Sequence, residues 1–185
     1  MESFMKELIL KRKKWNEVLA KWYNKEISDN ELIRESLLLN SKEIREFCKK
    51  KIIDISQKRN SDYRIALAFA LKESNINPFA VGDLFIKEDL SFPNYERGSW
   101  GMFQIYYYIH KKWVNFDRLR LPDIGYQILV FWDLYTKINT EISPNIQGED
   151  RLWLCAKRYN GSGKQAEIYA DIWMEIYKKL SKKYD

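Results

Sequence analysis

The sequence predicts a mainly α-helical fold that is interrupted by one irregular region, expected to be a long loop or a small β-hairpin. Apolar residues recur at three- and four-residue intervals over most of the 185 residues, which is the spacing of helices packed on a core. Prolines and glycines gather instead between residues 75 and 105, where they disfavour regular structure. A hydrophobic content of 45% is typical of a folded chain, so one domain with an appendage at most is expected.

Residues 1–60 are expected to form two or three helices that make up a basic N-terminal subdomain. Ser28 with Glu31 has the sequence of a capping box, and Ser41 offers a second N-cap. The segment holds 15 basic and 10 acidic residues, so five of the six net positive charges lie here. Such a segment could contact a polymer, a membrane or a partner, but packing on the rest of the chain with a solvated basic face is favoured. The apolar stripe of the first helix comprises Phe4, Leu8, Trp15, Val18, Leu19 and Trp22.

The second unit, residues 61–185, is organised around one apolar helix that begins after Ser61 or Asp62 and ends before Pro78. Glu73 is expected in the last turn of this mostly buried helix. Apolar surroundings and the negative end of the helix dipole both raise the pKa of a carboxyl group there. A carboxylic acid that is still partly protonated near neutral pH can act as a general acid. The alternative is that Glu73 is simply a solvated residue at a helix end.

Helices are predicted again after the irregular region. One is expected from Tyr106 to Val114, and a second starts with Pro122 in its first turn. A short helix over residues 150–159 is closed by the sequence Asn-Gly-Ser-Gly at residues 160–163. The apolar stripe of the last helix comprises Tyr169, Ile172, Trp173, Ile176, Tyr177 and Leu180.

Three short sequence blocks lie at predicted junctions between a helix and a loop. Residues 73–80 read E-S-N-I-N-P-F-A, residues 98–105 read G-S-W-G-M-F-Q-I and residues 158–163 read R-Y-N-G-S-G. These blocks resemble the signature motifs of lysozyme-like lytic transglycosylases, whose patterns are E-S-x-x-N-P-x-A, G-x-x-G-L-M-Q-I and A-Y-N-x-G. The blocks occur in family order within residues 62–182, and residues 1–60 lie outside the resemblance. A lysozyme-like fold of residues 61–185 is therefore expected, most similar to phage or prophage members that act as endolysins or virion-associated wall-degrading proteins.

The resemblance implies that Glu73 is the sole catalytic acid. It would protonate the oxygen of the β-1,4 bond between N-acetylmuramic acid and N-acetylglucosamine in peptidoglycan. It would then act as base on the muramyl C6 hydroxyl, which closes onto C1 and gives a 1,6-anhydro end, with help from the substrate's own N-acetyl group. The implied substrate-binding residues are Ser74, Trp100, Met102, Phe103, Gln104, Tyr159 and Asn160.

Individual roles follow from the same resemblance. Gln104 would hydrogen-bond the sugar, and Tyr159 would hydrogen-bond near Glu73 and hold its orientation. Ser74 is expected to support the turn rather than touch substrate. Met102 and Phe103 would line the cleft, and Trp100 would be a sugar platform. For Trp100 and Phe103 the alternative is core packing under the loop. Gly98 and Gly101 on either side of Trp100 would let backbone approach a ligand closely.

The sequence departs from the family pattern in three places. Sixteen residues separate Val81 from Gly98, where the family has few. A second carboxylate in this insertion could activate a water and give a hydrolase that resembles goose-type lysozyme, although loop acids are usually just solvated. Phe103 replaces a common Met, and Arg158 replaces a common Ala and would either meet a muramyl lactate or peptide carboxylate or point to solvent. The acids of the insertion are Asp83, Glu88, Asp89 and Glu96.

Other chemistries have little support in the sequence. His110 is the sole histidine, and Cys48 and Cys155 lie far apart in helical patterns, so they are expected to be reduced core residues and no metal site is expected. No cofactor fingerprint is present. The net charge of +6 suits an anionic partner, but nucleic acid is not expected. The expected partner is the peptidoglycan glycan strand.

The N-terminal ten residues mix charged and apolar side chains and contain no apolar core of a signal peptide. Synthesis in the cytoplasm is therefore expected, followed by action on the cell wall after lysis, after release by a holin, or as part of a virion. No transmembrane segment is expected, and the protein is predicted to be a monomer. The competing class is a non-enzymatic helical protein. It would be a structural or binding protein, such as a virion scaffold domain, that keeps the lysozyme-like fold, or a basic nucleic-acid binder.

Overall fold

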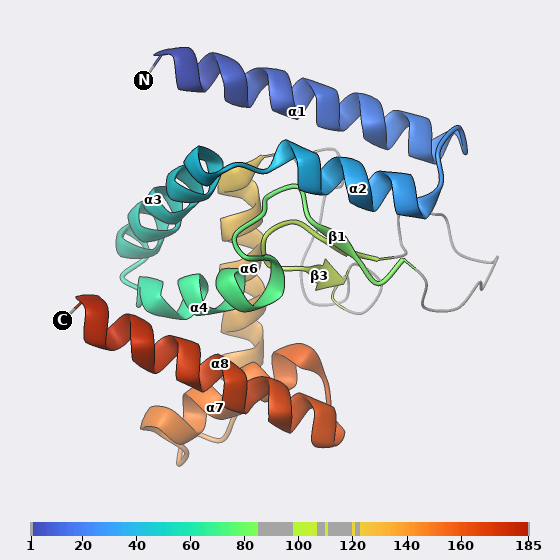
Figure 1. Cartoon of the computed structure of the whole chain (residues 1–185). Helices are drawn as coiled ribbons and strands as arrows, with labels where there is room; N and C mark the ends of the chain where they lie inside the picture. The colour runs from blue at the N-terminus through green and yellow to red at the C-terminus, as the bar shows by residue number, and fades with distance from the viewer. Residues whose placement is uncertain (1, 85–97, 107–109, 111–119, 121–122, 185) are drawn as a thin grey trace.

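The computed structural model describes residues 2–84, 98–106, 110, 120 and 123–184, which are mainly helical with one small sheet (Figure 1). The seven helices in this part of the chain are α1 (Glu2–Tyr23), α2 (Asp29–Leu39), α3 (Lys42–Lys58), α4 (Tyr63–Ser74), α6 (Ile124–Thr140), α7 (Gly148–Asn160) and α8 (Gly163–Tyr184). The strands are β1 (Val81–Gly82), β2 (Ser99–Trp100) and β3 (Ile105–Tyr106). The prediction of a mainly α fold with a poor β region after α4 is confirmed.

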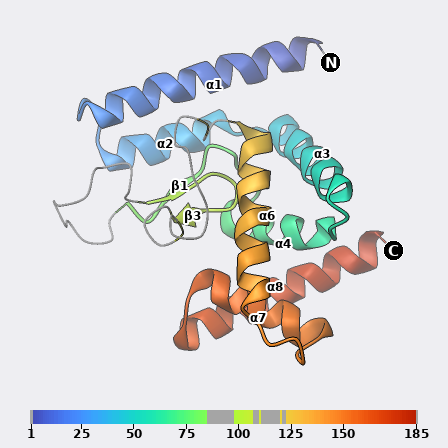
Figure 2. The ribbon, with the colours of Figure 1, turned by 180° about the vertical axis from the view of Figure 1, so that it is seen from behind.

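The helices enclose one core. Helices α1 and α2 lie together on one side of the molecule, α7 and α8 lie on the other, and α6 passes between them (Figures 1 and 2). Buried apolar side chains from Leu8 in α1 to Met174 in α8 form a single cluster. The boundary predicted at residue 60 therefore does not divide the core.

The N-terminal helices begin where the sequence indicates. The Ser28 hydroxyl accepts a hydrogen bond from the Glu31 amide, and the Glu31 carboxylate accepts one of 2.8 Å from the Ser28 amide, so the capping box is formed. Ser41 caps α3 through the Ile44 amide. The predicted stripe of α1 is buried, apart from half-buried Phe4.

The end of α4 is fixed by a compact set of hydrogen bonds. The helix begins at the N-cap Asp62, which accepts from the Arg64 amide at 3.0 Å. It ends at Asn75, whose left-handed φ of 53° is continued by a φ of 59° at buried Ile76. The Ser74 hydroxyl donates to the Met102 carbonyl at 2.9 Å and accepts from the Asn77 amide at 2.9 Å. These bonds join the end of α4 to the sheet region immediately after Glu73.

The three strands are antiparallel in the order β1-β2-β3, with Val81 opposite Trp100 and Trp100 opposite Ile105. Buried Gln127 of α6 holds this sheet against the helices. Its amide nitrogen donates to the Pro78 carbonyl, and its amide oxygen accepts from the Met102 amide, both at 2.8 Å. The sheet is thus attached at once to the end of α4 and to α6.

The structure departs from the predicted elements at several points. Tyr106 belongs to β3 and not to a helix, and most of the helix expected to follow it lies outside the described residues. Helix α6 starts at Ile124 after the N-cap Asp123, so it begins two residues later than predicted from Pro122. Ile172 is 43% exposed because the buried stripe of α8 is centred on Ala166, Ala170 and Trp173, which places Ile172 on its flank.

Two further expectations concern the cysteines and the membrane. Cys48 and Cys155 are both free and buried, which confirms them as core residues. Within the part of the chain that is described, none of the helices combines the length and apolar content needed to cross a bilayer.

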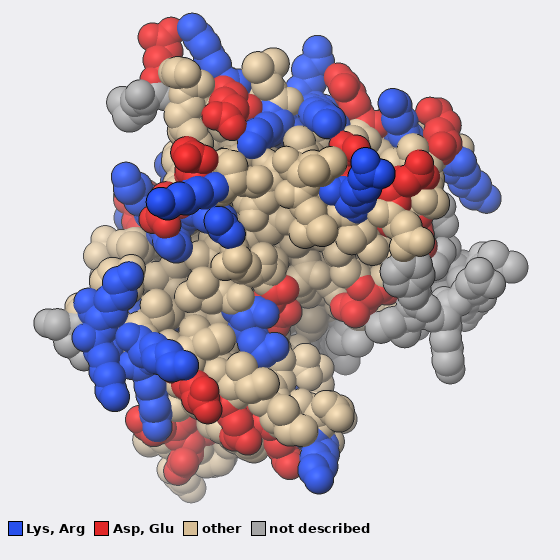
Figure 3. Space-filling view, in the orientation of Figure 1, with Lys and Arg blue, Asp and Glu red and all other residues tan. Residues whose placement is uncertain are grey.

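Charged side chains of both signs are interspersed over the face seen in Figure 3, with basic groups gathered at its lower left, over the C-terminal end of α8. Four lysines, at positions 178, 179, 182 and 183, lie in that part of the helix.

Candidate active site

A cavity of about 980 Å³ opens between the end of α4, the small sheet, the C-terminal ends of α6 and α7, and α8. Most of the residues that line it have polar or charged side chains. The charged and amide side chains that line it are Lys72, Glu73, Asp83, Gln104, Glu141, Arg158 and Asn160. The first and third sequence blocks therefore meet at one cavity, and the second contributes Ser99 and Gln104 to it.

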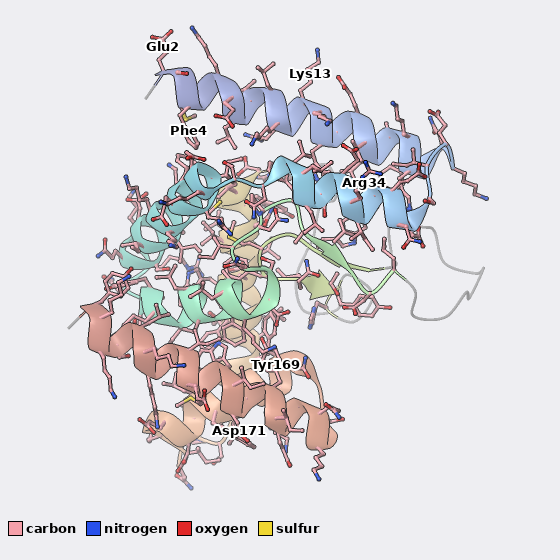
Figure 4. All side chains as sticks on the ribbon, viewed as in Figure 1. Glu2, Phe4, Lys13, Arg34, Tyr169 and Asp171 are labelled. Atoms are coloured by element: carbon pink, nitrogen blue, oxygen red, sulfur yellow. The ribbon has the colours of Figure 1, made fainter. Side chains whose placement is uncertain are left out.

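Glu73 lies in the last turn of α4, as predicted, with its side chain half-buried at the cavity. The Tyr169 hydroxyl of α8 donates a hydrogen bond to Oε1 of Glu73. Figure 4 shows Tyr169 on the side of α8 that faces α4. The Lys72 ammonium group lies over the Tyr169 ring, with its nitrogen 4.8 Å from the ring centroid, in a cation–π contact.

Burial raises the pKa of Glu73 to about 7. Removal from water penalises the charged form, and this outweighs the hydrogen bond from Tyr169 and the charge of Lys72, which both lower the pKa. The negative charge of Asp83 raises it further. The expectation of an acid that is partly protonated near neutral pH therefore has a structural basis in the packing of α4 against α8.

The tyrosine that holds Glu73 differs from the one expected. The Tyr159 hydroxyl donates to the Phe103 carbonyl at 2.6 Å, and its ring packs 4.5 Å from that of Phe69. Tyr159 lines the cavity, but its hydroxyl does not bond to Glu73. The tyrosine that bonds to Glu73 is Tyr169, so the prediction named the wrong tyrosine. In the sequence, Tyr169 is only one member of an apolar stripe, and nothing in that stripe distinguishes it.

Gln104 lines the cavity. It has a left-handed φ of 46°, and its amide nitrogen donates to the Gly101 carbonyl at 2.9 Å. Its side chain crosses the face of Gly82, where a Cβ atom would collide with the Gln104 amide oxygen. Glycine at position 82 thus allows the amide group to reach the cavity.

Three residues predicted to contact substrate lie in the core instead. Trp100 is 2% exposed and packs edge-on against Trp22 of α1 at 5.7 Å. Phe103 stacks on Phe131 at 4.3 Å, and Met102 is fully buried. For Trp100 and Phe103 the alternative of core packing under the loop is therefore confirmed, and the cleft position implied for Met102 is wrong. These side chains form the support beneath the cavity.

The glycines on either side of Trp100 leave space for core side chains to pack against the backbone. A Cβ atom at Gly98 would lie 2.7 Å from the Leu84 side chain, and one at Gly101 would overlap the Gln127 amide group. Both glycines have left-handed φ values, 89° and 73°. They allow protein groups, not a ligand, to approach the backbone. Ser74 lies in the turn after Glu73 with its hydroxyl already bonded, in the supporting position expected for it.

Of the candidate second carboxylates, Asp83 lies at the cavity. It is exposed, has a left-handed φ of 56°, and accepts a hydrogen bond from the buried Ser99 hydroxyl. This bond orients the carboxylate beside Glu73, since both residues line one cavity and the charge of Asp83 acts on Glu73. The other candidates, Glu88, Asp89 and Glu96, lie outside the described residues.

The wall of the cavity formed by α6 and α7 is more open. Arg158 and Glu141 face each other there, with 3.7 Å between Nη1 and Oε2. Asn160, the last residue of α7, is exposed beside them. His110 is buried with its ring 5.9 Å from that of Tyr159, which agrees with a structural histidine.

The site has the character of a proton donor with polar neighbours. In the described part of the chain, no three His, Cys, Asp or Glu side chains come together in a way that could hold a metal ion. Comparison of the chain with protein-family models, with curated proteins and with solved structures found no match.

Proposed function

We propose that this protein cleaves the β-1,4 bond between N-acetylmuramic acid and N-acetylglucosamine in peptidoglycan, on a lysozyme-like arrangement of residues 61–185. The observation that carries the proposal is Glu73. Its pKa of about 7 leaves a large fraction of the side chain protonated near neutral pH, and it faces a cavity at the upper end of the about 300–1,000 Å³ typical of ligand sites.

The reaction uses one carboxyl group twice. Glu73 first gives its proton to the glycosidic oxygen, so that the bond from that oxygen to C1 of the muramyl ring breaks. The carboxylate that remains then takes the proton of the muramyl C6 hydroxyl, whose oxygen bonds to C1 and closes the 1,6-anhydro ring. Tyr169 holds the carboxyl group through both steps, and the substrate's N-acetyl group assists at C1.

The polar lining supports this assignment. Gln104 and Asn160 bring amide groups to the cavity, and amides can hydrogen-bond the hydroxyl and acetamido groups of a sugar. Acid–base catalysis by a placed carboxyl group contributes about 10²–10⁴ in rate. The remainder comes from distortion of the sugar and from oriented dipoles around the breaking bond.

A second candidate function is hydrolysis. Asp83 lies at the same cavity as Glu73 and is oriented by Ser99, so it could take a proton from a water that attacks C1. The product would then carry an ordinary reducing end in place of the anhydro ring.

The variant Glu73→Gln tests the proposal in a gel that contains bacterial cell wall. We expect the wild-type protein to clear the gel and Glu73→Gln to lose activity by about 10³-fold, within the range given for a positioned acid. Glu175→Gln, which makes the same change at an exposed position of α8, is the matched control and retains clearing. Clearing by Glu73→Gln would remove Glu73 from the mechanism, and no clearing by the wild type would favour a binding or structural role.

Mass spectrometry of the released fragments separates the two enzymatic candidates. Anhydro ends support the single-carboxylate mechanism. Reducing ends support hydrolysis, and the Asp83 variants described in the Discussion then test whether Asp83 is the second carboxylate.

A further inference from the structure

On the wall of the cavity formed by α6 and α7, Arg158 forms a weak ion pair with Glu141. Arg158 is 44% exposed and Glu141 is 54% exposed, and the closest approach of their charged groups is 3.7 Å. An exposed ion pair contributes little to stability, because water screens both charges. A carboxylate that binds at the cavity can therefore displace Glu141 from Arg158 at little cost.

Arg158 lines the same cavity as Glu73 but belongs to the wall formed by α6 and α7. The hydrogen-bond partner of Glu73 is Tyr169 of α8, on the other wall. Lys72 lies beside the reacting group because its ammonium group stacks on the ring that hydrogen-bonds Glu73. Arg158 thus lies where it can contact a neighbouring part of a bound glycan without taking part in the proton transfer.

We propose that Arg158 makes the cavity selective for glycan that carries a free carboxylate close to the cleaved bond. A guanidinium group presents two parallel N–H donors that match the two oxygens of a carboxylate. Because Glu141 lies next to Arg158, it occupies the guanidinium in the empty site and gives way when the substrate carboxylate arrives. This inference rests on the proposed function.

Two parts of peptidoglycan supply such a carboxylate. One is the lactyl group of a muramic acid that bears no peptide. The other is a side-chain or terminal carboxylate of an attached stem peptide. Both present the same chemistry to Arg158, so the ligands of the test must separate them.

The test measures binding to Glu73→Gln protein, which does not turn over its ligand. Three forms of the disaccharide of N-acetylglucosamine and N-acetylmuramic acid serve as probes: the free lactyl acid, its neutral N-methylamide, and the conjugate with L-alanyl-D-isoglutamate. Titration calorimetry compares the Glu73→Gln background with the added changes Arg158→Gln, Glu141→Gln and Arg34→Gln. Arg34 is exposed on α2, far from the cavity, and is the matched control (Figure 4).

We expect one of the two acids to bind about tenfold more tightly than the neutral amide, as one charged hydrogen-bonded pair provides. The acid that does so identifies the source of the carboxylate. Arg158→Gln should reduce this ratio to about one, Glu141→Gln should increase it a few-fold by removing the competing carboxylate, and Arg34→Gln should leave it unchanged.

Three results would overturn the inference. Equal binding of acid and amide to the Glu73→Gln background, or a preference that survives Arg158→Gln, would refute the selectivity and leave the proposed function intact. Absence of binding by all three disaccharides would refute the proposed substrate, and the selectivity with it.

Discussion

The two walls of the cavity differ in how their charged groups are held. On the wall formed by α4 and α8, Glu73 is half-buried and hydrogen-bonded to Tyr169. On the wall formed by α6 and α7, Arg158 and Glu141 are exposed and only loosely paired. Burial controls the proton of a carboxyl group, whereas exposure leaves a charge free to exchange partners. The first wall therefore suits chemistry and the second suits recognition.

The wall formed by α4 and α8 is packed on aromatic side chains behind Glu73. The Phe69 ring of α4 lies 4.8 Å from Trp173 of α8 and 5.3 Å from Phe131 of α6. Directly after Glu73 the chain takes two consecutive left-handed residues, Asn75 and Ile76. A β-branched residue in that region is strained by about 1–3 kcal/mol. The hydrogen bonds of Ser74 and the burial of Ile76 maintain this turn, which keeps the helix end at the cavity.

Among the residues that support Glu73, the largest effect on activity is expected from Tyr169→Phe. This change removes the hydroxyl that orients Glu73 but keeps the ring. We expect activity to fall by about 10–100-fold, because a charge-assisted hydrogen bond contributes about 1.5–3 kcal/mol. The same bond lowers the pKa of Glu73. The pH at which activity is lost on the alkaline side should therefore move upward, and a pH–activity profile measures both changes.

Tyr159→Phe is the matched control, since its hydroxyl bonds to the Phe103 carbonyl and not to Glu73. It should leave the alkaline limit of activity in place and lower the free energy of unfolding by about 1–3 kcal/mol, because a buried carbonyl loses its donor. An upward shift of the limit in Tyr159→Phe but not in Tyr169→Phe would restore the role first expected for Tyr159.

The contrast between Tyr159 and Tyr169 shows which features of the site could be predicted from the sequence. Local signals predicted the capping box at Ser28, the helix that ends after Glu73 and the apolar stripe of α1, because each depends on residues a few positions apart. The bond from Tyr169 to Glu73 joins residues 96 positions apart. It depends on the angle at which α8 packs on α4, and no local pattern encodes that angle.

Trp100 illustrates a second limit. Neighbouring glycines suggested an open loop that presents an aromatic ring to a ligand. In the structure the same glycines let Leu84 and Gln127 approach the backbone, and Trp100 is buried against α1. A glycine indicates that another group approaches the backbone closely, but the sequence does not indicate whether that group belongs to a ligand or to the protein itself.

A second prediction concerns stability and the burial of Glu73. Its folded-state pKa of about 7 lies above the ordinary value of 4.5, so the folded state binds the proton more tightly than the unfolded state. The stabilisation is complete below pH 4.5 and is lost as the pH rises through 7. Glu73→Gln stays neutral and avoids this loss. We expect the variant to gain about 2 kcal/mol relative to wild type between these limits, after allowance for water at the cavity.

Urea unfolding at a series of pH values measures this difference. Glu175→Gln, at an exposed position, should show no comparable gain. A difference between Glu73→Gln and wild type that is constant from pH 4 to pH 8 would mean that the Glu73 carboxyl group is not desolvated, and the acid role would lose its physical basis.

The smallest effect is expected from Asp83→Asn, which also sharpens the choice between the two mechanisms. The charge of Asp83 raises the pKa of Glu73, so its removal should move the alkaline limit of activity slightly downward, opposite to Tyr169→Phe. Ser99→Ala, which deletes the hydroxyl that orients Asp83 but keeps the charge, separates orientation from electrostatics. If Glu73 acts alone, both variants keep activity at pH 6 within a few-fold, and their products still carry anhydro ends. Loss of activity in both would instead identify Asp83 as the base that activates water, because only a hydrolase needs that carboxylate both charged and oriented.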